Sequence, residues 1–127
     1  MTELHQVYKC EVCGNIVNVI HSGAGTLVCC GKPMVLQVEH EEDQGFEKHL
    51  PSLSFENSEL IVNIGDVPHP MEEAHYIEWI EYIVNGISSR KFLKPNEKPQ
   101  AVFNFIESDN YIVRAYCNLH GLWEIRM

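Results

Sequence analysis

The sequence predicts an all-β protein in which a small cysteine-rich module is followed by an antiparallel β-sandwich. Three observations lead to this prediction. Four of the five cysteines lie within residues 1–36, whereas Val, Ile, Phe, Tyr and Trp are concentrated from Ser52 onward, where they favour strands. Turn-forming residues separate these apolar stretches at short intervals. Seven short strands with turns at such a spacing are typical of two packed antiparallel sheets.

Residues 1–36 are the predicted metal module, and their cysteines follow the pattern Cys10-x2-Cys13-x15-Cys29-Cys30. A segment of this length buries too little apolar surface to fold alone, so a bound metal ion would supply part of its stability. Four thiolates suit tetrahedral zinc or iron. The adjacent pair Cys29-Cys30 argues against a zinc ribbon, in which two residues normally separate that pair. Zinc and disulfide pairing stay open as alternatives.

Residues 37–47 are predicted to be a linker, because five of the nine residues at its end are acidic and such runs are usually solvated. Residues 48–127 then form the second domain. Its predicted strands are residues 52–56, 59–65, 76–84, 87–94, 100–107, 110–116 and 122–126.

Two turns and one ambiguous strand complete this outline. Asn85-Gly86 is the strongest hairpin signal in the chain, and the stretch Ser108-Asp109-Asn110 marks another turn. Residues 76–84 also fit one face of a helix, but their aromatic and β-branched side chains favour a strand.

The charge of the chain is strongly negative and unevenly distributed. Eighteen acidic residues stand against nine Lys and Arg, which gives a formal net charge of −9. Residues 1–36 are neutral, so the other 91 residues carry the whole excess. Such acidity argues against nucleic acid and anionic membrane partners.

No stretch approaches the roughly 20 apolar residues of a membrane span, and the first residues do not resemble a signal peptide. We therefore expect a cytoplasmic protein whose cysteines bind metal or carry redox chemistry.

A second candidate metal site begins at Cys117-x-x-His120, which places a thiolate and an imidazole within reach of one ion. Two ligands do not make a site, and a lone cysteine is more often a small buried apolar residue. Three upstream histidines change this assessment, and they are His49, His69 and His75. The prolines on both sides of His69 stiffen its backbone, so its ring would lose little entropy on binding a metal.

Taken together, these residues resemble the two-iron superoxide reductases, the desulfoferrodoxins, over essentially the whole chain. The matching stretches are Val7-Tyr8-Lys9-Cys10-x-x-Cys13-Gly14-Asn15-Ile16, Cys29-Cys30-Gly31, Glu47-Lys48-His49, His69-Pro70-Met71-Glu72-Glu73-x-His75-Tyr76-Ile77-x-Trp79-Ile80 and Cys117-Asn118-x-His120-Gly121. The resemblance implies a desulforedoxin-like module with one iron held by Cys10, Cys13, Cys29 and Cys30. It also implies an immunoglobulin-like sandwich with a second iron held by His49, His69, His75, His120 and Cys117.

The reaction implied by the resemblance is the one-electron reduction of superoxide to hydrogen peroxide. Iron is usually six-coordinate, so five ligands leave one position open for the substrate. The resemblance implies that Glu47 fills this position in the ferric resting state. It implies that Lys48 supplies positive charge beside the position and helps to deliver protons. From the residues alone, both would be ordinary solvated loop residues.

The resemblance further implies a rubredoxin-like electron donor and a homodimer. Two other classes of function stay open. One is an electron-transfer protein in which the four-cysteine centre is active and the second site is a minor metal binder, and the other is a zinc-stabilised structural module. We interpret His5, His21 and His40 as surface residues that bind no metal. The larger aromatic residues Trp79, Phe103, Phe105 and Trp123 are interpreted as core and not as an electron path.

Overall fold

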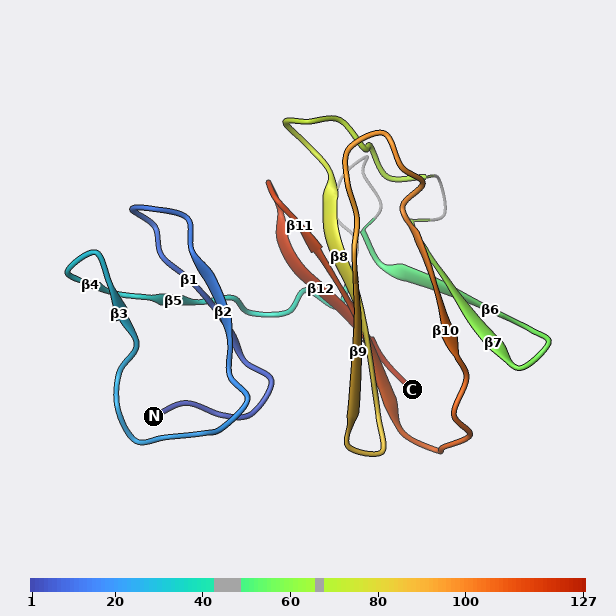
Figure 1. Ribbon diagram of the computed structural model, residues 1–127, viewed down its shortest axis with the longest axis horizontal. Helices are drawn as coiled ribbons and strands as arrows, with labels where there is room; N and C mark the ends of the chain where they lie inside the picture. Colours follow the sequence, from blue (N-terminus) through green and yellow to red (C-terminus); the bar gives the residue numbers. More distant parts are fainter. Residues whose placement is uncertain (43–48, 66–67) are drawn as a thin grey trace. The chain divides into compact units, whose positions relative to one another are not determined.

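The computed structural model describes residues 1–42, 49–65 and 68–127. The chain divides into two compact units, Met1–Val38 and Glu39–Met127. All regular structure in the described residues is β-strand (Figure 1), which confirms the predicted all-β class. These residues therefore include no helix that is long and apolar enough to cross a membrane.

The first unit contains five very short strands around a very small core. One sheet has the order β2-β1-β5, and a separate hairpin pairs β3 with β4. The bounds are β1 Val7–Lys9, β2 Ile16–Asn18, β3 Val28–Cys29, β4 Lys32–Pro33 and β5 Val35–Leu36. Its buried apolar residues are Val7, Cys10 and Val19. So few buried side chains agree with the prediction that this module needs a metal to be stable.

The turn between β3 and β4 consists of Cys30 and Gly31, and both residues have positive φ, +53° and +73°. Two consecutive positive φ angles in a two-residue hairpin loop are the signature of a type I′ turn. The first position of this turn normally holds Asn, Asp or Gly, because a β-carbon is strained there. A cysteine therefore occupies a backbone position that does not favour it.

The second unit is a sandwich of a three-stranded and a four-stranded antiparallel sheet, with the orders β10-β7-β6 and β12-β11-β8-β9. The bounds are β6 Pro51–Glu56, β7 Glu59–Ile64, β8 Ile77–Val84, β9 Ile87–Phe92, β10 Gln100–Asn104, β11 Tyr111–Cys117 and β12 Gly121–Arg126. All seven predicted strands are present, and the segment that also fitted a helix is β8. Along the chain β6 and β7 belong to the first sheet, β8 and β9 to the second, β10 to the first, and β11 and β12 to the second, and such crossing between two sheets is typical of the predicted immunoglobulin-like topology.

The core of the sandwich lies between these two sheets. Leu60, Val62 and Ile64 of β7 belong to one buried cluster with Ile80 and Tyr82 of β8, and its remaining buried members are Ile77, Val84, Ala101, Phe103, Val113, Ala115 and Cys117. The hairpin predicted at Asn85-Gly86 is present, with φ of +48° and +76°. Cys117, the last residue of β11, thus belongs both to the core and to the candidate site.

Candidate metal centres

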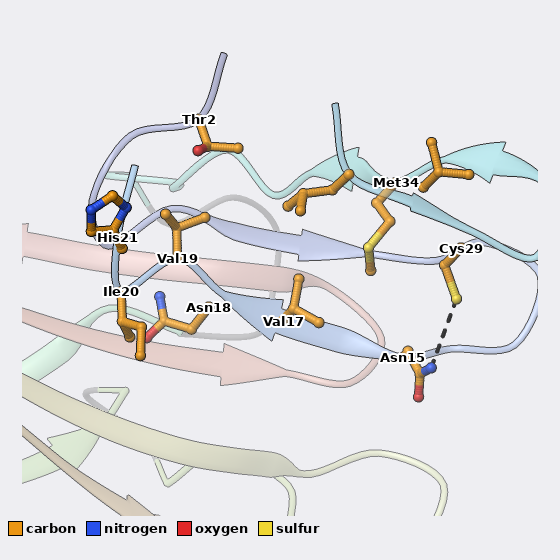
Figure 2. A pocket seen from close by; sticks show the side chains of 11 residues that line it. Thr2, Asn15, Val17, Asn18, Val19, Ile20, His21, Cys29 and Met34 are labelled. Carbon is orange, nitrogen blue, oxygen red and sulfur yellow. Dashed lines mark hydrogen bonds between the residues drawn. The ribbon is translucent and has the colours of Figure 1, made fainter. Parts of the chain in front are cut away.

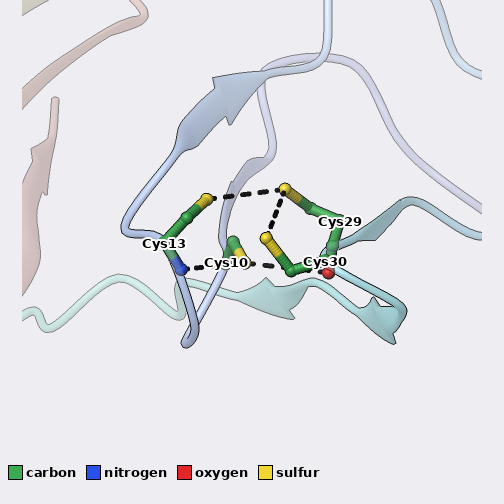
Figure 3. Close-up of side chains that lie close together, drawn as sticks. All are labelled: Cys10, Cys13, Cys29 and Cys30. Carbon is green, nitrogen blue, oxygen red and sulfur yellow. Dashed lines mark hydrogen bonds between the residues drawn. The ribbon is translucent and has the colours of Figure 1, made fainter.

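The first centre is formed by the two turns of the N-terminal unit. Cys10 follows β1 and Cys13 lies in the turn before β2, while Cys29 ends β3 and Cys30 begins the β3–β4 turn. Figure 3 shows the four side chains pointing toward one another from these two turns, and their sulfur atoms all lie within 4.8 Å of one another. The left-handed backbone at Cys30 allows two adjacent cysteines to reach the same point.

The spacing of the sulfur atoms fits a tetrahedral metal better than a disulfide. Cys13 Sγ lies 3.6 Å from Cys29 Sγ, which lies 3.9 Å from Cys30 Sγ. Four sulfurs each about 2.3 Å from a tetrahedral ion would be roughly 3.8 Å apart. All five cysteines are free thiols, so the structure contains none of the disulfides considered as an alternative.

Hydrogen bonds shift the pKa values of the cysteine thiols in the first centre. The backbone N–H of Cys13 donates to Cys10 Sγ at 3.4 Å and lowers the pKa of Cys10 to about 6. The hydrogen bond between the thiols of Cys13 and Cys30 raises the pKa of Cys30 to about 12. One thiolate therefore forms readily in the metal-free protein, whereas four thiolates need the charge of a bound ion.

The second centre lies at one end of the sandwich, where several strands begin or end. His49 precedes β6, and His69 lies in the connection between β7 and β8. His75 precedes β8, while Cys117 ends β11 and His120 precedes β12. The ligand atoms of His49, His69, His75 and Cys117 lie within 4.8 Å of one another. Residues far apart in the sequence thus converge because the antiparallel pairing brings these strand ends together.

The four imidazole rings form a closed cycle around one point. Neighbouring ring centroids are 4.6 Å apart for His49–His69, 4.8 Å for His69–His75, 5.2 Å for His75–His120 and 5.0 Å for His120–His49. His120 Nδ1 lies 3.2 Å from His49 Nε2 and 3.9 Å from Cys117 Sγ. Two nitrogens bound at right angles to one ion, each about 2.1 Å away, would be roughly 3 Å apart. The donor set therefore fits a single metal ion.

The ring of His69 is oriented by a hydrogen bond next to it in the sequence. Its Nδ1 lies 2.7 Å from the carbonyl oxygen of Pro70, and a carbonyl accepts only from a protonated nitrogen. Nδ1 must therefore carry the proton, which leaves Nε2 as the ligand atom. The stiff Pro68-His69-Pro70 segment holds a buried histidine (3% exposed).

Asn118 is a supporting residue that the sequence reasoning did not single out. Its side-chain oxygen accepts from the backbone N–H of Tyr76 at 2.9 Å, and its amide group donates to the carbonyl of Ala74 at 3.1 Å. Its own N–H donates to the carbonyl of Tyr76 at 3.2 Å. These three hydrogen bonds tie the turn that carries Cys117 and His120 to the segment that carries His75. The sequence could have pointed to Asn118 only through its position between the candidate ligands Cys117 and His120.

The structure tests only some of the predictions for residues that are not metal ligands. Glu47 and Lys48 lie outside the described residues. His21 and His40 are exposed, as predicted for histidines that bind no metal, whereas His5 is half-buried. Trp79, Phe103 and Trp123 are buried in agreement with the core interpretation, and Phe105 packs against the core.

Comparisons with known proteins identify both units. The family described as "Desulfoferrodoxin, N-terminal domain" matches residues 2–37, and the family described as "Desulfoferrodoxin" matches residues 41–126. The chain is 56% identical over 124 residues to a desulfoferrodoxin homolog of Archaeoglobus fulgidus, with 98% of each chain covered.

Two solved structures are similar to this chain. The superoxide reductase from Treponema pallidum has a TM-score of 0.76 and 23% identity, with 94% of this chain and 96% of that chain covered. This similarity supports the fold. The superoxide reductase from Giardia intestinalis has a TM-score of 0.58 and 29% identity, and 98% of it aligns with 65% of this chain.

Proposed function

Because this chain belongs to the desulfoferrodoxin family, we propose that it is a superoxide reductase that converts superoxide to hydrogen peroxide. The closed cycle of four imidazoles beside one thiolate is the observation that carries this proposal. The similarity to the superoxide reductase from Giardia intestinalis supports it. The chain binds two iron ions, one at each centre.

The proposed ligands are the residues that converge in the two units. Cys10, Cys13, Cys29 and Cys30 would hold the first iron, and His49, His69, His75, His120 and Cys117 would hold the second. The first is the desulforedoxin-like domain, predicted at 1–36, and the second is the superoxide reductase domain, predicted at 48–127. When bound, the second iron would supply the one electron that reduces superoxide.

The side chains around the second iron have separate tasks in this proposal. The four neutral imidazoles add no charge, so the centre stays cationic and attracts an anionic substrate. The thiolate of Cys117 donates electron density to the metal. Lys48, adjacent to His49 in the sequence, would attract superoxide and help to deliver protons. Glu47 would occupy the open position after the product has left.

The reaction also needs an external electron, because each turnover consumes one. We propose a small electron carrier of the rubredoxin type as the donor.

A cytoplasmic location is consistent with five free cysteines, since such thiols persist in a reducing compartment.

We further propose that the chain forms a homodimer through its N-terminal unit. Figure 2 shows a pocket in this unit that is lined by Val17, Val19, Ile20 and Met34, next to Cys29. Ile20 is 86% exposed and Val28 is 60% exposed, which is unusual for apolar side chains grouped around one pocket. A second copy would cover the same residues on both chains, as a two-fold interface requires.

The experiment that tests the enzymatic function is a single-turnover reaction. The protein is loaded with iron and reduced, and superoxide is then added in known amounts. Each superoxide should take up one electron and two protons and yield one hydrogen peroxide, with no oxygen released from a second superoxide. The His75→Ala variant is the control, because it lacks one proposed ligand. If the second centre is not oxidised, or if oxygen is produced as in dismutation, the proposal is wrong.

A further inference from the structure

Trp123 lies flat against His49, one of the proposed ligands of the second iron. The two ring centroids are 4.4 Å apart and the planes differ by 11°. The other ring neighbours of His49 are steeply inclined to it, at 58° for His69 and 81° for His120. The indole therefore contacts one whole face of the imidazole, and Trp123 is only 5% exposed.

The position of Trp123 is set by the four-stranded sheet. It is paired with Ala115 of β11, so it faces the same side as Ala115, which belongs to the sandwich core. Because β12 is the last strand of its sheet, the indole lies at the sheet edge, where a single strand supports it on one side.

His40 covers this edge. Its N–H donates to the carbonyl of Leu122 at 2.8 Å, and its carbonyl accepts from the N–H of Glu124 at 3.0 Å. These bonds form a parallel bridge between His40 and Trp123, which places both side chains on the same face. The two rings are 4.6 Å apart. In addition, the carboxylate of the preceding residue, Glu39, lies 3.5 Å from Arg114 on β11.

The consequence for the metal site is an orientation constraint on His49. Its Nε2 faces His120 Nδ1, and a rotation of the ring about its own bonds would move Nε2 away from that point. A ring that lies flat on an indole cannot rotate in this way without losing the contact. The Pro70 carbonyl constrains His69 with a hydrogen bond, whereas Trp123 constrains His49 with an aromatic face.

We propose that Trp123 is a positioning residue for His49 and that His40 holds the indole in place. This inference rests on the proposed iron site but not on the proposed reaction with superoxide. Loss of the aromatic face should weaken iron binding at the second centre, because the ring orientation of a metal-bound histidine depends on its neighbours. The first centre lies in a different unit and should not respond.

The test measures how fast a chelator removes iron from each centre of the purified, iron-loaded protein. The visible absorption of the two oxidised iron–thiolate sites reports how much iron each centre still holds. Trp123→Leu should accelerate loss from the second centre by about tenfold. Trp123→Phe should restore most of the wild-type retention, because phenylalanine keeps a flat ring. His40→Ala should give a smaller acceleration, together with a shifted electron paramagnetic resonance signal of the ferric second centre.

Phe103→Leu is the matched control, because Phe103 is a buried aromatic residue of the same sandwich whose ring packs against Tyr82 in the core. The proposal is overturned if Trp123→Leu retains iron like the wild type, if Phe103→Leu loses it equally fast, or if Trp123→Phe gives no rescue. Should Trp123→Leu fail to fold, an unchanged ferric spectrum and unchanged iron retention in His40→Ala would overturn it instead. None of these measurements uses superoxide, so they remain valid even if the proposed reaction is wrong.

Discussion

At Cys30 a single backbone angle explains how two adjacent cysteines serve one metal. The residue has φ of +53° in a type I′ turn, a conformation that costs a residue with a β-carbon roughly 1 kcal/mol or more. This cost is offset only if the thiol gains something from the position. Coordination of a metal by Cys30 provides that gain.

Replacing Cys30 by Ser should therefore remove the iron of the first centre and leave the second centre loaded. The reason is that the two ligand sets lie in separate units. Iron analysis and the visible spectrum should show one iron per chain instead of two, with superoxide reduction retained. If this variant lost both irons or all activity, the two centres would not be independent.

The sequence was informative about individual residues where chemistry restricts the choice. Cysteine spacing and the stiff proline–histidine–proline segment identified residues that the structure brings together. The sequence did not predict the contacts that Trp123 and Asn118 make with the second site, because these contacts depend on strand pairing. Nothing in the residue types says that an indole predicted as core also faces a histidine.

At the scale of strands, the prediction succeeded where local rules decide. The concentration of Val, Ile, Phe, Tyr and Trp between turn-forming residues located all seven strands of the second unit, and Asn85-Gly86 located a hairpin. The short strands of the first unit were not predicted, because two or three residues are too few to show a period of two.

A row of charges across the four-stranded sheet was also missed. Arg90, Glu81, Arg114 and Glu124 are directly paired neighbours on β9, β8, β11 and β12, and Glu81 is completely buried. Glu81 accepts hydrogen bonds from Arg90 at 2.8 Å and from Arg114 at 2.8 Å, and from Ser88 at 2.7 Å. The sequence cannot show this row, because each member comes from a different strand.

Removing one member of this row should destabilise the second unit strongly. Glu81→Ala would leave the buried Arg114 without its main counter-charge, at a cost of about 3 kcal/mol or more. The Tm of the iron-loaded protein should fall by roughly 10 °C or more. The double variant Glu81→Leu/Arg114→Leu should recover at least half of that loss, because it removes both fully buried charges together, while Glu124 keeps its ion pair with Arg126 and Arg90 is partly exposed to solvent. A double variant as unstable as Glu81→Ala would contradict this explanation.

At the scale of the whole molecule, the first unit buries very little apolar surface for its size. If a second copy covers its exposed residues, Ile20→Glu should convert a dimer to a monomer, because it places a charge in an apolar interface. Sedimentation of the iron-loaded protein measures this directly. Phe92→Glu is the control, because Phe92 is similarly exposed (74%) but belongs to the second unit. A monomeric wild type, or equal behaviour of both variants, would disprove this interface.

The negative net charge of the molecule is unfavourable for attracting its proposed substrate. Superoxide is an anion, and residues 39–127 carry all of the −9 charge. The average field of the protein therefore repels superoxide, and a fast reaction needs positive charge close to the open metal position. Lys48 is the nearest cation in the sequence to any proposed ligand of the second iron. Two unit charges about 4 Å apart interact by roughly 1 kcal/mol in water and about 4 kcal/mol at an effective dielectric constant of 20.

Lys48→Ile should therefore slow the reaction of the reduced protein with superoxide by about tenfold or somewhat more. Added salt should slow the native protein, because it screens the local attraction. It should slow the variant less, or even accelerate it, because only the repulsive net charge then remains. Pulse radiolysis at two ionic strengths measures both the rate and its dependence on salt. A variant with the rate and salt dependence of the wild type would show that Lys48 does not guide superoxide to the iron.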